Sequence, residues 1–289
     1  MSVSVQAIAS GSNGNCFLIQ SEDQAVLIDA GISRKRIVDS LNKINVPLSK
    51  ITGILVTHAH SDHISGLPVL KRYLDAPMYA TAGTISELYK MGIKNPEWHT
   101  IAKDFSRIEQ GKILDIGDFK IITMHAEHDS PGTVGYRIHH KVENTPGVTV
   151  SVLTDTGKLN DRDIWRLARS DLLLLESNHN LELLKNSRRP NYLKSRVRAN
   201  HLSNDQAADI LSNIGKYEES KRIKGILLGH LSGECNSPDL IRDWVRNWQQ
   251  RLDKNWNFYM CPRDNSSDLI TISPETIKEE KKFAGYIDF

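Results

Sequence analysis

The feature that most constrains this chain is an apolar segment that ends directly in a cluster of histidines. Residues 51–56 read ITGILV and show no alternation between apolar and charged positions. Such a run predicts a strand covered on both faces, because a strand with one face in water would alternate. Residues 57–63 follow at once and read THAHSDH. A buried strand that ends in metal-ligand side chains predicts a layered α/β protein whose chemistry lies at a strand end.

The run THAHSDH predicts a metal site. It supplies the imidazoles of His58, His60 and His63 and the carboxylate of Asp62, which are ligand types that zinc accepts. Neighbouring ligands in so short a turn fan outward, so two ions fit the run better than one. The alternative is that these histidines are solvated or cap a helix. Further ligands must come from distant segments, and the candidates after later expected strands are His128, Asp155 and His230, with His125 competing with His128.

Asp155 has a second feature of a metal ligand. It stands in the turn LTDTG, directly after the expected strand 148–153. A carboxylate there can bridge two ions about 3.5–4 Å apart, because one oxygen faces each ion. The alternative is an aspartate that only forms the turn before Gly157.

The rest of the chain alternates groups of strands with helices. We expect strands at residues 3–9, 16–20, 25–29, 51–56, 112–116, 119–125, 134–138, 148–153, 172–177, 226–230, 258–261 and 269–272. Helices are expected at 33–44, 64–74, 82–91, 161–168, 204–214 and 238–249. This order predicts an α/β domain with two sheets packed inside. No repeat or linker marks a boundary, so we expect one domain over residues 1–289, with the last residues (279–289) loosely ordered.

Composition excludes several classes of protein. With 39% hydrophobic and 25% charged residues, the chain is neither collagen-like nor disordered. Its net charge of +2 gives no general attraction to polyanions, so any basic surface must be local. Three widely spaced cysteines form no disulfide framework and suit a reducing compartment. No apolar run approaches the ~18 residues of a membrane span, and the first residues do not form a signal peptide. We therefore expect a cytoplasmic protein without membrane association.

Five motifs occur in an order that resembles the metallo-β-lactamase-fold hydrolases. They are LIDAG at 27–31, THAHSDH at 57–63, HDSPGTVGY at 128–136, TDTG at 154–157 and LGHLS at 228–232. Within that superfamily, GSNGNC, ESNHN, HLSN and GHLSGECNSP are similar to the YycJ/WalJ group of DNA exonucleases, and the region from Glu176 onward more distantly resembles tRNase Z. The resemblance implies an αββα four-layer sandwich with the metal site at one edge of the two sheets.

The resemblance also implies a ligand set for two divalent ions. One ion is expected on His58, His60 and His128, the other on Asp62, His63 and His230, and Asp155 is expected to bridge them. Asp29 is expected to orient ligand groups through hydrogen bonds, although an aspartate before Ala-Gly can also simply form a turn. Zinc, manganese and iron all suit histidine and carboxylate ligands, and no cysteine stands at a ligand position to select zinc.

Two further residues are expected to take part in catalysis beside the ligand Asp62. Glu176 ends the apolar run DLLLLE, and His201 precedes an expected helix. In tRNase Z, a glutamate and a histidine at matching places form a pair in which the histidine donates a proton. A carboxylate stabilises an imidazolium and keeps it available as an acid near neutral pH. The alternatives are a strand-end carboxylate and a histidine at a helix start without catalytic duty, and His179 is a weaker candidate.

A local basic run points to a polyanionic substrate. Between Glu182 and Asp205 there is no acidic residue. Cations that face phosphates and an aromatic ring that stacks on bases are typical of nucleic-acid binding. The alternative is a solvated basic helix. The candidate substrate-binding residues are Lys185, Arg188, Arg189, Tyr192, Lys194, Arg196 and Arg198.

Three functions are compatible with these sequence features. The first is a dinuclear metal-dependent nuclease that acts on DNA ends, with RNA processing of the tRNase Z type as a close variant. The second is a small-molecule hydrolase of the glyoxalase II or lactonase type, which also carries HxHxDH. The third is a non-catalytic metal-binding protein. The basic run and the Glu176–His201 pair favour a nuclease, whereas the absence of a long insertion between Asp155 and His230 argues against a β-CASP nuclease.

Overall fold

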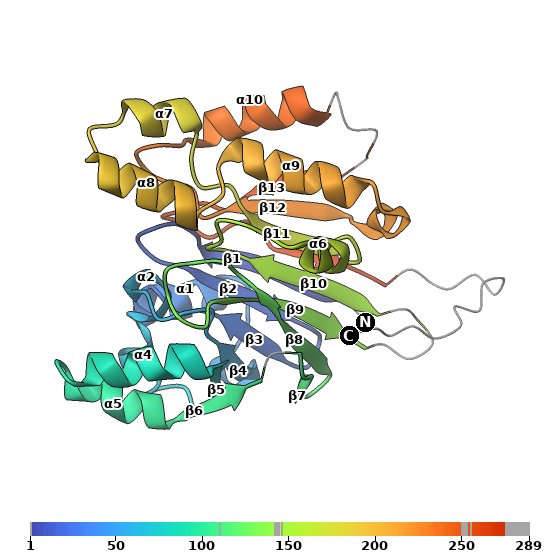
Figure 1. Ribbon diagram of the computed structural model, residues 1–289. Coiled ribbons are helices and arrows are strands. Elements are labelled where there is room, and N and C mark those ends of the chain that lie inside the picture. Colours follow the sequence, from blue (N-terminus) through green and yellow to red (C-terminus); the bar gives the residue numbers. More distant parts are fainter. Residues whose placement is uncertain are drawn as a thin grey trace.

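Two seven-stranded sheets form the centre of the fold (Figure 1). The computed structural model describes residues 2–109, 111–141, 145, 147–249, 254 and 256–274. The first sheet has the order β14-β1-β2-β3-β4-β5-β6 and the second β13-β12-β11-β10-β9-β8-β7. The first comprises β1 (Val3–Ala9), β2 (Cys16–Gln20), β3 (Ala25–Ile28), β4 (Ile51–Leu55), β5 (Met78–Thr81), β6 (Phe105–Ile108) and β14 (Ile270–Ile272). The second comprises β7 (Leu114–Ile116), β8 (Phe119–His125), β9 (Val134–His140), β10 (Val148–Leu153), β11 (Leu172–Glu176), β12 (Gly225–Gly229) and β13 (Asn257–Met260).

Helices cover the outer face of each sheet (Figure 1). The first sheet carries α1 (Arg34–Lys43), α3 (Leu67–Leu70), α4 (Ala82–Gly92) and α5 (Pro96–Lys103), whose apolar sides share one hydrophobic cluster with it. The second sheet carries α6 (Asp161–Leu167), α9 (Asn204–Gly215) and α10 (Pro238–Gln249). The remaining helices are α2 (Ser61–Ile64), α7 (Leu181–Asn186), α8 (Asn191–Asn200), η1 (Leu48–Lys50) and η2 (Glu218–Arg222).

The two sheets pack face to face through a hydrophobic core to which both contribute. Phe17 of the first sheet and Phe119 and Tyr136 of the second are among its largest fully buried side chains. Burial of a side chain of this size stabilises the fold by roughly 1.5–3 kcal/mol. The hydroxyl of Tyr136 donates to the carbonyl of Val56, 2.6 Å away, and so joins the second sheet to the segment that leads to His58. The expected αββα four-layer sandwich is confirmed.

Strand direction explains why distant motifs meet. Strands β10, β11, β12 and β13 run parallel. Strand β8 runs in the same direction, because it is antiparallel to β9, which is antiparallel to β10. The carboxyl ends of these strands therefore lie at one edge of the second sheet, where Glu176 ends β11 and where Asp155 and His230 follow β10 and β12. In the first sheet, the parallel strands β3 and β4 end just before Asp29 and Thr57.

The structure departs from the expected elements in two ways. The single helix expected at 64–74 is replaced by α2 and α3, and Gly66 lies at the interruption. A Cβ at Gly66 would lie 1.9 Å from the carbonyl oxygen of Ile32, so the chain passes too close there for any side chain. Strands β5 and β6 and helices α5, α7 and α8 were not among the expected elements.

Two further expectations concern the last residues of the chain and membrane-spanning segments. The residues expected to be loosely ordered, 279–289, lie outside the described part of the chain. In the part that is described, no helix combines the length and the apolar character needed to cross a membrane.

Candidate metal centre

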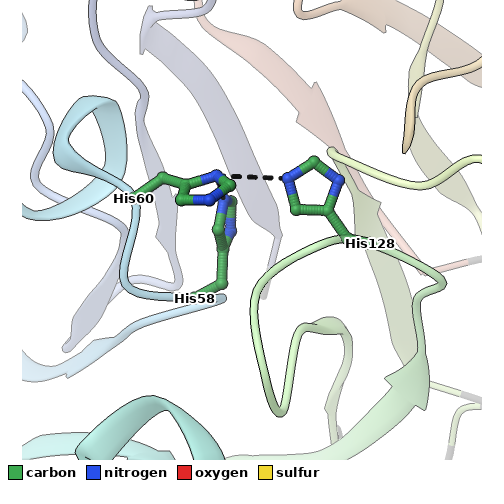
Figure 2. Close-up of side chains that lie close together, drawn as sticks. All are labelled: His58, His60 and His128. Carbon is green, nitrogen blue, oxygen red and sulfur yellow. Dashed lines mark hydrogen bonds between the residues drawn. The ribbon is translucent and has the colours of Figure 1, made fainter. Parts of the chain in front are cut away.

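Three histidines converge at the edge where β4 and β8 end. His58 follows β4, His60 precedes α2, and His128 lies in the loop after β8. Nε2 of His58 lies 3.1 Å and Nε2 of His128 lies 3.2 Å from Nδ1 of His60 (Figure 2). One nitrogen from each ring thus points at a common centre, and these three residues form a group able to hold a metal ion.

In His58 and His128, the ring nitrogen that faces away from this centre also has a hydrogen-bond partner. Nδ1 of His128 lies 2.9 Å from the carbonyl of Asn200, so it carries the proton and leaves the Nε2 lone pair for a ligand. Nδ1 of His58 lies 3.0 Å from the hydroxyl of Thr57. Burial holds the pKa of His58 well below its usual value and also lowers the pKa of His60. These two rings are therefore neutral near pH 7, as metal ligands must be.

A second group contains Asp62, His63 and His230. Oδ2 of Asp62 lies 3.5 Å from Nε2 of His63 and 3.6 Å from Nε2 of His230. Asp62 and His63 come from α2, whereas His230 follows β12. The backbone of His230 is left-handed, with φ of 55°, and its N–H donates to the hydroxyl of Ser10 at 2.8 Å. A non-glycine residue in this region costs about 1–3 kcal/mol, so the surrounding contacts hold the ring in place.

Asp155 lies between the two groups. Its Oδ2 is 3.1 Å from Nε2 of His63 and its Oδ1 is 3.3 Å from Nδ1 of His230, and it also groups with His58. Burial alone would raise the pKa of Asp155, but His230 and His63 outweigh burial and hold it well below the usual value. The carboxylate is therefore ionised and positioned between the ligand groups.

The cluster has the properties of a cation site. Among the described residues, Oδ2 of Asp155 and Nε2 of His230 are buried polar atoms without a hydrogen-bond partner, and such orphaned atoms are rare unless an ion or water satisfies them. Burial would lower the pKa of His230, but the neighbouring carboxylates Asp155, Asp62 and Glu176 raise it to about 10. A proton on His230 thus balances an excess of negative charge that a metal cation would balance equally well. The residues present fit a metal centre.

Asp29 is fully buried and contacts His63 of the second group. Its backbone is left-handed, with φ of 59°. Its carboxylate accepts hydrogen bonds from the Thr57 backbone at 2.8 Å, from the Thr57 hydroxyl at 2.9 Å and from Nδ1 of His63 at 2.7 Å. The proton of His63 is therefore fixed on Nδ1, and Nε2 is left to face Asp62 and Asp155.

Asn15 is a supporting residue that sequence reasoning missed. The loop that contains it joins β1 to β2, and the side-chain amide of Asn15 is fully buried. Its Nδ2 lies 3.3 Å from Oδ2 of Asp62 and 3.0 Å from Nε2 of His63, and also bonds the carbonyl of Gly11 at 3.1 Å. The motif GSNGNC contains this residue, but no local pattern indicates that its amide reaches a segment 47 residues away.

Glu176 connects the cluster to His201. One carboxylate oxygen, Oε1, accepts from Nδ1 of His201 at 2.7 Å and from Nδ1 of His230 at 2.8 Å. The other accepts from the backbone N–H groups of Thr156 and Leu202. Burial would raise the pKa of Glu176, but the two histidines lower it to about 2. Burial would likewise lower the pKa of His201, but Glu176 raises it. The expected pair is in contact, and Glu176 also orients His230.

A cavity of about 260 Å³ opens over the cluster. Of the seven substrate-binding candidates, the structure places Arg189 and Arg196 in its lining. The other five do not line it, and Tyr192 is 71% exposed on α8. The lining residues are Ser12, His60, Asp62, His128, Asp129, Asp155, Asn178, Arg189, Leu193, Arg196, Val197, His201, His230 and Ser232.

Two histidines whose roles the sequence does not decide, His125 and His179, lie apart from the ligand groups. His125, the alternative to His128, is an exposed residue at the end of β8 and belongs to none of the groups found in the described residues. His179 is fully buried, and neither ring nitrogen has a partner within the described residues. It does not line the cavity.

Comparisons with known proteins identify the family and the fold of the chain. A family model described as a beta-lactamase superfamily domain matches residues 24–222. The chain is 31% identical over 279 residues to the exodeoxyribonuclease WalJ of Streptococcus pneumoniae, covering 91% of this chain and 94% of that protein. It is 30% identical over 184 residues to the exodeoxyribonuclease YycJ of Bacillus anthracis, covering 64% and 66%. The metallo-beta-lactamase fold protein YhfI from Bacillus subtilis superposes with a TM-score of 0.68 at 18% identity, covering 94% of this chain and 100% of YhfI.

The four-layer fold and the cluster of histidines and aspartates at its edge define a metal-dependent hydrolase. The chain belongs to the beta-lactamase superfamily. The family expected from the five motifs is therefore confirmed.

Proposed function

We propose that this protein is a dinuclear metal-dependent phosphodiesterase that degrades DNA from its ends. The observation that carries the proposal is one cavity lined by His201 and two arginines directly above the clustered ligands. Metal ligands suit hydrolysis in general, whereas arginines beside them suit a phosphate substrate. The relatives named exodeoxyribonucleases support the same conclusion.

The chain offers ligands for two ions. His58, His60 and His128 would hold one ion, Asp62, His63 and His230 the other, and Asp155 would bridge them. When bound, such ions would lower the pKa of an attacking water and neutralise charge on the phosphate. The three cysteines are buried outside these groups, so the ligands are histidine and carboxylate alone. This set suits zinc, manganese or iron. Three free cysteines also suit a reducing compartment, and we place the protein in the cytoplasm.

His201 supplies the proton for the leaving oxygen in this proposal. Glu176 accepts the Nδ1 proton of His201, and the Nε2 side of the ring remains for the cavity that His201 lines. Because Glu176 raises the pKa of His201, the ring keeps a proton to donate near neutral pH. Arg189 and Arg196 bind the phosphates of the chain to be cut.

A substrate panel tests the proposal. Purified protein with Mn²⁺ or Zn²⁺ is incubated with end-labelled single- and double-stranded DNA, with RNA, and with thioester and lactone compounds. We expect nucleotides released from DNA ends by the parent and by Asp161→Ala, an exposed control position on α6, and no release by Asp155→Ala. Hydrolysis of thioester or lactone alone would contradict the proposal, and cleavage of RNA alone would replace DNA by the RNA-processing alternative.

A further inference from the structure

One wall of the cavity is formed by α8 and the bend that precedes it. Arg189, Leu193, Arg196 and Val197 all line the cavity. Leu193, Arg196 and Val197 lie on one side of α8, because residues three and four apart share a face of a helix. Arg189 lies in the bend just before the helix. The wall therefore presents two apolar side chains and two cations to the cavity that opens over the clustered ligands.

The apolar part of this wall is not explained by packing. Leu193 and Val197 are half-buried, and neither belongs to the hydrophobic clusters found in the described residues. Helix α8 has no fully buried residue at all. In the wall of a cavity, these two side chains offer contact to the apolar face of a ligand.

The two arginines share one hydrogen-bonding pattern. Nε of Arg189 donates to Glu234 at 2.7 Å, and Nε of Arg196 donates to Asp129 at 2.5 Å. Within the described residues, the terminal Nη groups of both side chains have no hydrogen-bond partner, and the side chains are 31% and 58% exposed. Each acid thus fixes its guanidinium through Nε, and the Nη groups are left for an anion such as phosphate.

We propose that this wall of the cavity is the subsite for one unpaired terminal nucleotide, whose base lies on Leu193 and Val197 of α8 while Arg189 and Arg196 hold adjacent phosphates. The inference rests on the proposed function and names its substrate as a single-stranded end. The face of a base is accessible only when its neighbour is unstacked, and apolar contact with it is tolerant of sequence. A cavity of about 260 Å³ lies just below the roughly 300–1,000 Å³ of small-ligand sites and accepts one nucleotide at a time.

The test compares oligonucleotide ends with and without a base. Single-stranded 20-residue DNA carries either normal nucleotides throughout or an abasic unit at one end or the other, and KM is measured for the metal-loaded protein. Binding to the chelator-treated protein is measured by fluorescence anisotropy. We expect the protein to bind and cut a normal end about tenfold better than the abasic form of that end, which corresponds to one or two apolar groups removed from water.

Variants assign the preference to α8. Leu193→Ser and Val197→Ser should reduce the preference for a normal end to less than threefold. Leu183→Ser is the matched control, because Leu183 is a 40% exposed leucine on the neighbouring helix α7 and does not line the cavity. It should keep the full preference. Thermal unfolding and metal content check that each variant folds.

The outcomes separate this inference from the proposed function. If the protein cuts normal and abasic ends with equal KM, or if Leu193→Ser and Val197→Ser keep the preference of the parent, the subsite is refuted and the nuclease remains. If the parent cuts no nucleic acid, the proposed function fails first. The comparison of ends needs only the parent protein, so it decides even if a variant does not fold.

Discussion

Replacing Asp29 by asparagine should weaken metal binding without changing any of the proposed ligands. The carboxylate of Asp29 accepts hydrogen bonds from the backbone and hydroxyl of Thr57 and from Nδ1 of His63. Asparagine has the same shape, but it carries no charge and offers one acceptor oxygen instead of two. Its NH₂ group must face either Thr57 or the Nδ1–H of His63, and both of these are donors there.

The expected losses of stability and of metal affinity follow from the hydrogen bond between the Asp29 carboxylate and His63. A hydrogen bond to a charged group contributes about 1.5–3 kcal/mol, so the metal-free variant should lose about that much free energy of unfolding. Partners that orient a metal-ligating histidine contribute about 10- to 100-fold in metal affinity, which corresponds to about 1.4–2.8 kcal/mol. We therefore expect Asp29→Asn to raise the Kd for metal by 10- to 100-fold.

Chelator competition measures the metal affinity, and chemical denaturation of the metal-free protein measures stability. Asp171→Asn is the matched control, because Asp171 is also buried and accepts from the backbone of Thr149 and from Arg222, both at 2.7 Å. It precedes β11, at the end opposite to Glu176. The control should lose stability and keep its metal affinity. A Kd for metal that changes equally little in both variants would refute the role assigned to Asp29.

Three further predictions concern the remaining parts of the site. His201→Ala should lower kcat by about 10²- to 10⁴-fold with unchanged metal content; an unchanged kcat would contradict its role as proton donor. Arg189→Ala and Arg196→Ala should each weaken nucleic-acid binding and reduce the slope of log affinity against log salt by about one. The control Arg188→Ala, outside the cavity lining, should have a smaller effect. Equal slopes for all three variants would argue against the cavity as the binding site. Asn15→Leu should loosen metal by about tenfold in chelator competition, and the same loss in Asn13→Leu, an exposed position of that loop, would assign the effect to the loop in general.

The sequence predicts the fold well where the pattern is local. Residues 51–56 form a buried strand because their apolar run has no alternation, and β4 covers Ile51–Leu55. Strand β6 was missed because it spans only the four residues Phe105–Ile108, and the two central ones, Ser106 and Arg107, are exposed. The interruption between α2 and α3 was missed because it depends on the close approach of Gly66 to Ile32, and contacts between distant segments leave no periodic signal.

The same contrast holds for the candidate site. The spacing within THAHSDH and the positions of strand ends predict which side chains meet, and the structure brings all seven ligand candidates into overlapping groups. The basic run predicts a charged surface, but only the folded chain places Arg189 and Arg196 in the cavity lining and leaves Tyr192 exposed outside it. The amide of Asn15 and the second bond of Glu176 to His230 depend on tertiary contacts alone.

Stepwise metal addition to the metal-free protein tests the central claim most directly. Release of nucleotides from end-labelled single-stranded DNA is measured while Mn²⁺ or Zn²⁺ is added from zero to four equivalents per chain. Our account predicts no cleavage in excess chelator, cleavage that rises with metal and levels off at about two equivalents, and no cleavage at any ratio for Asp155→Ala. Full cleavage by the metal-free protein, or undiminished cleavage by Asp155→Ala, would contradict the claim that this cluster is the hydrolytic centre.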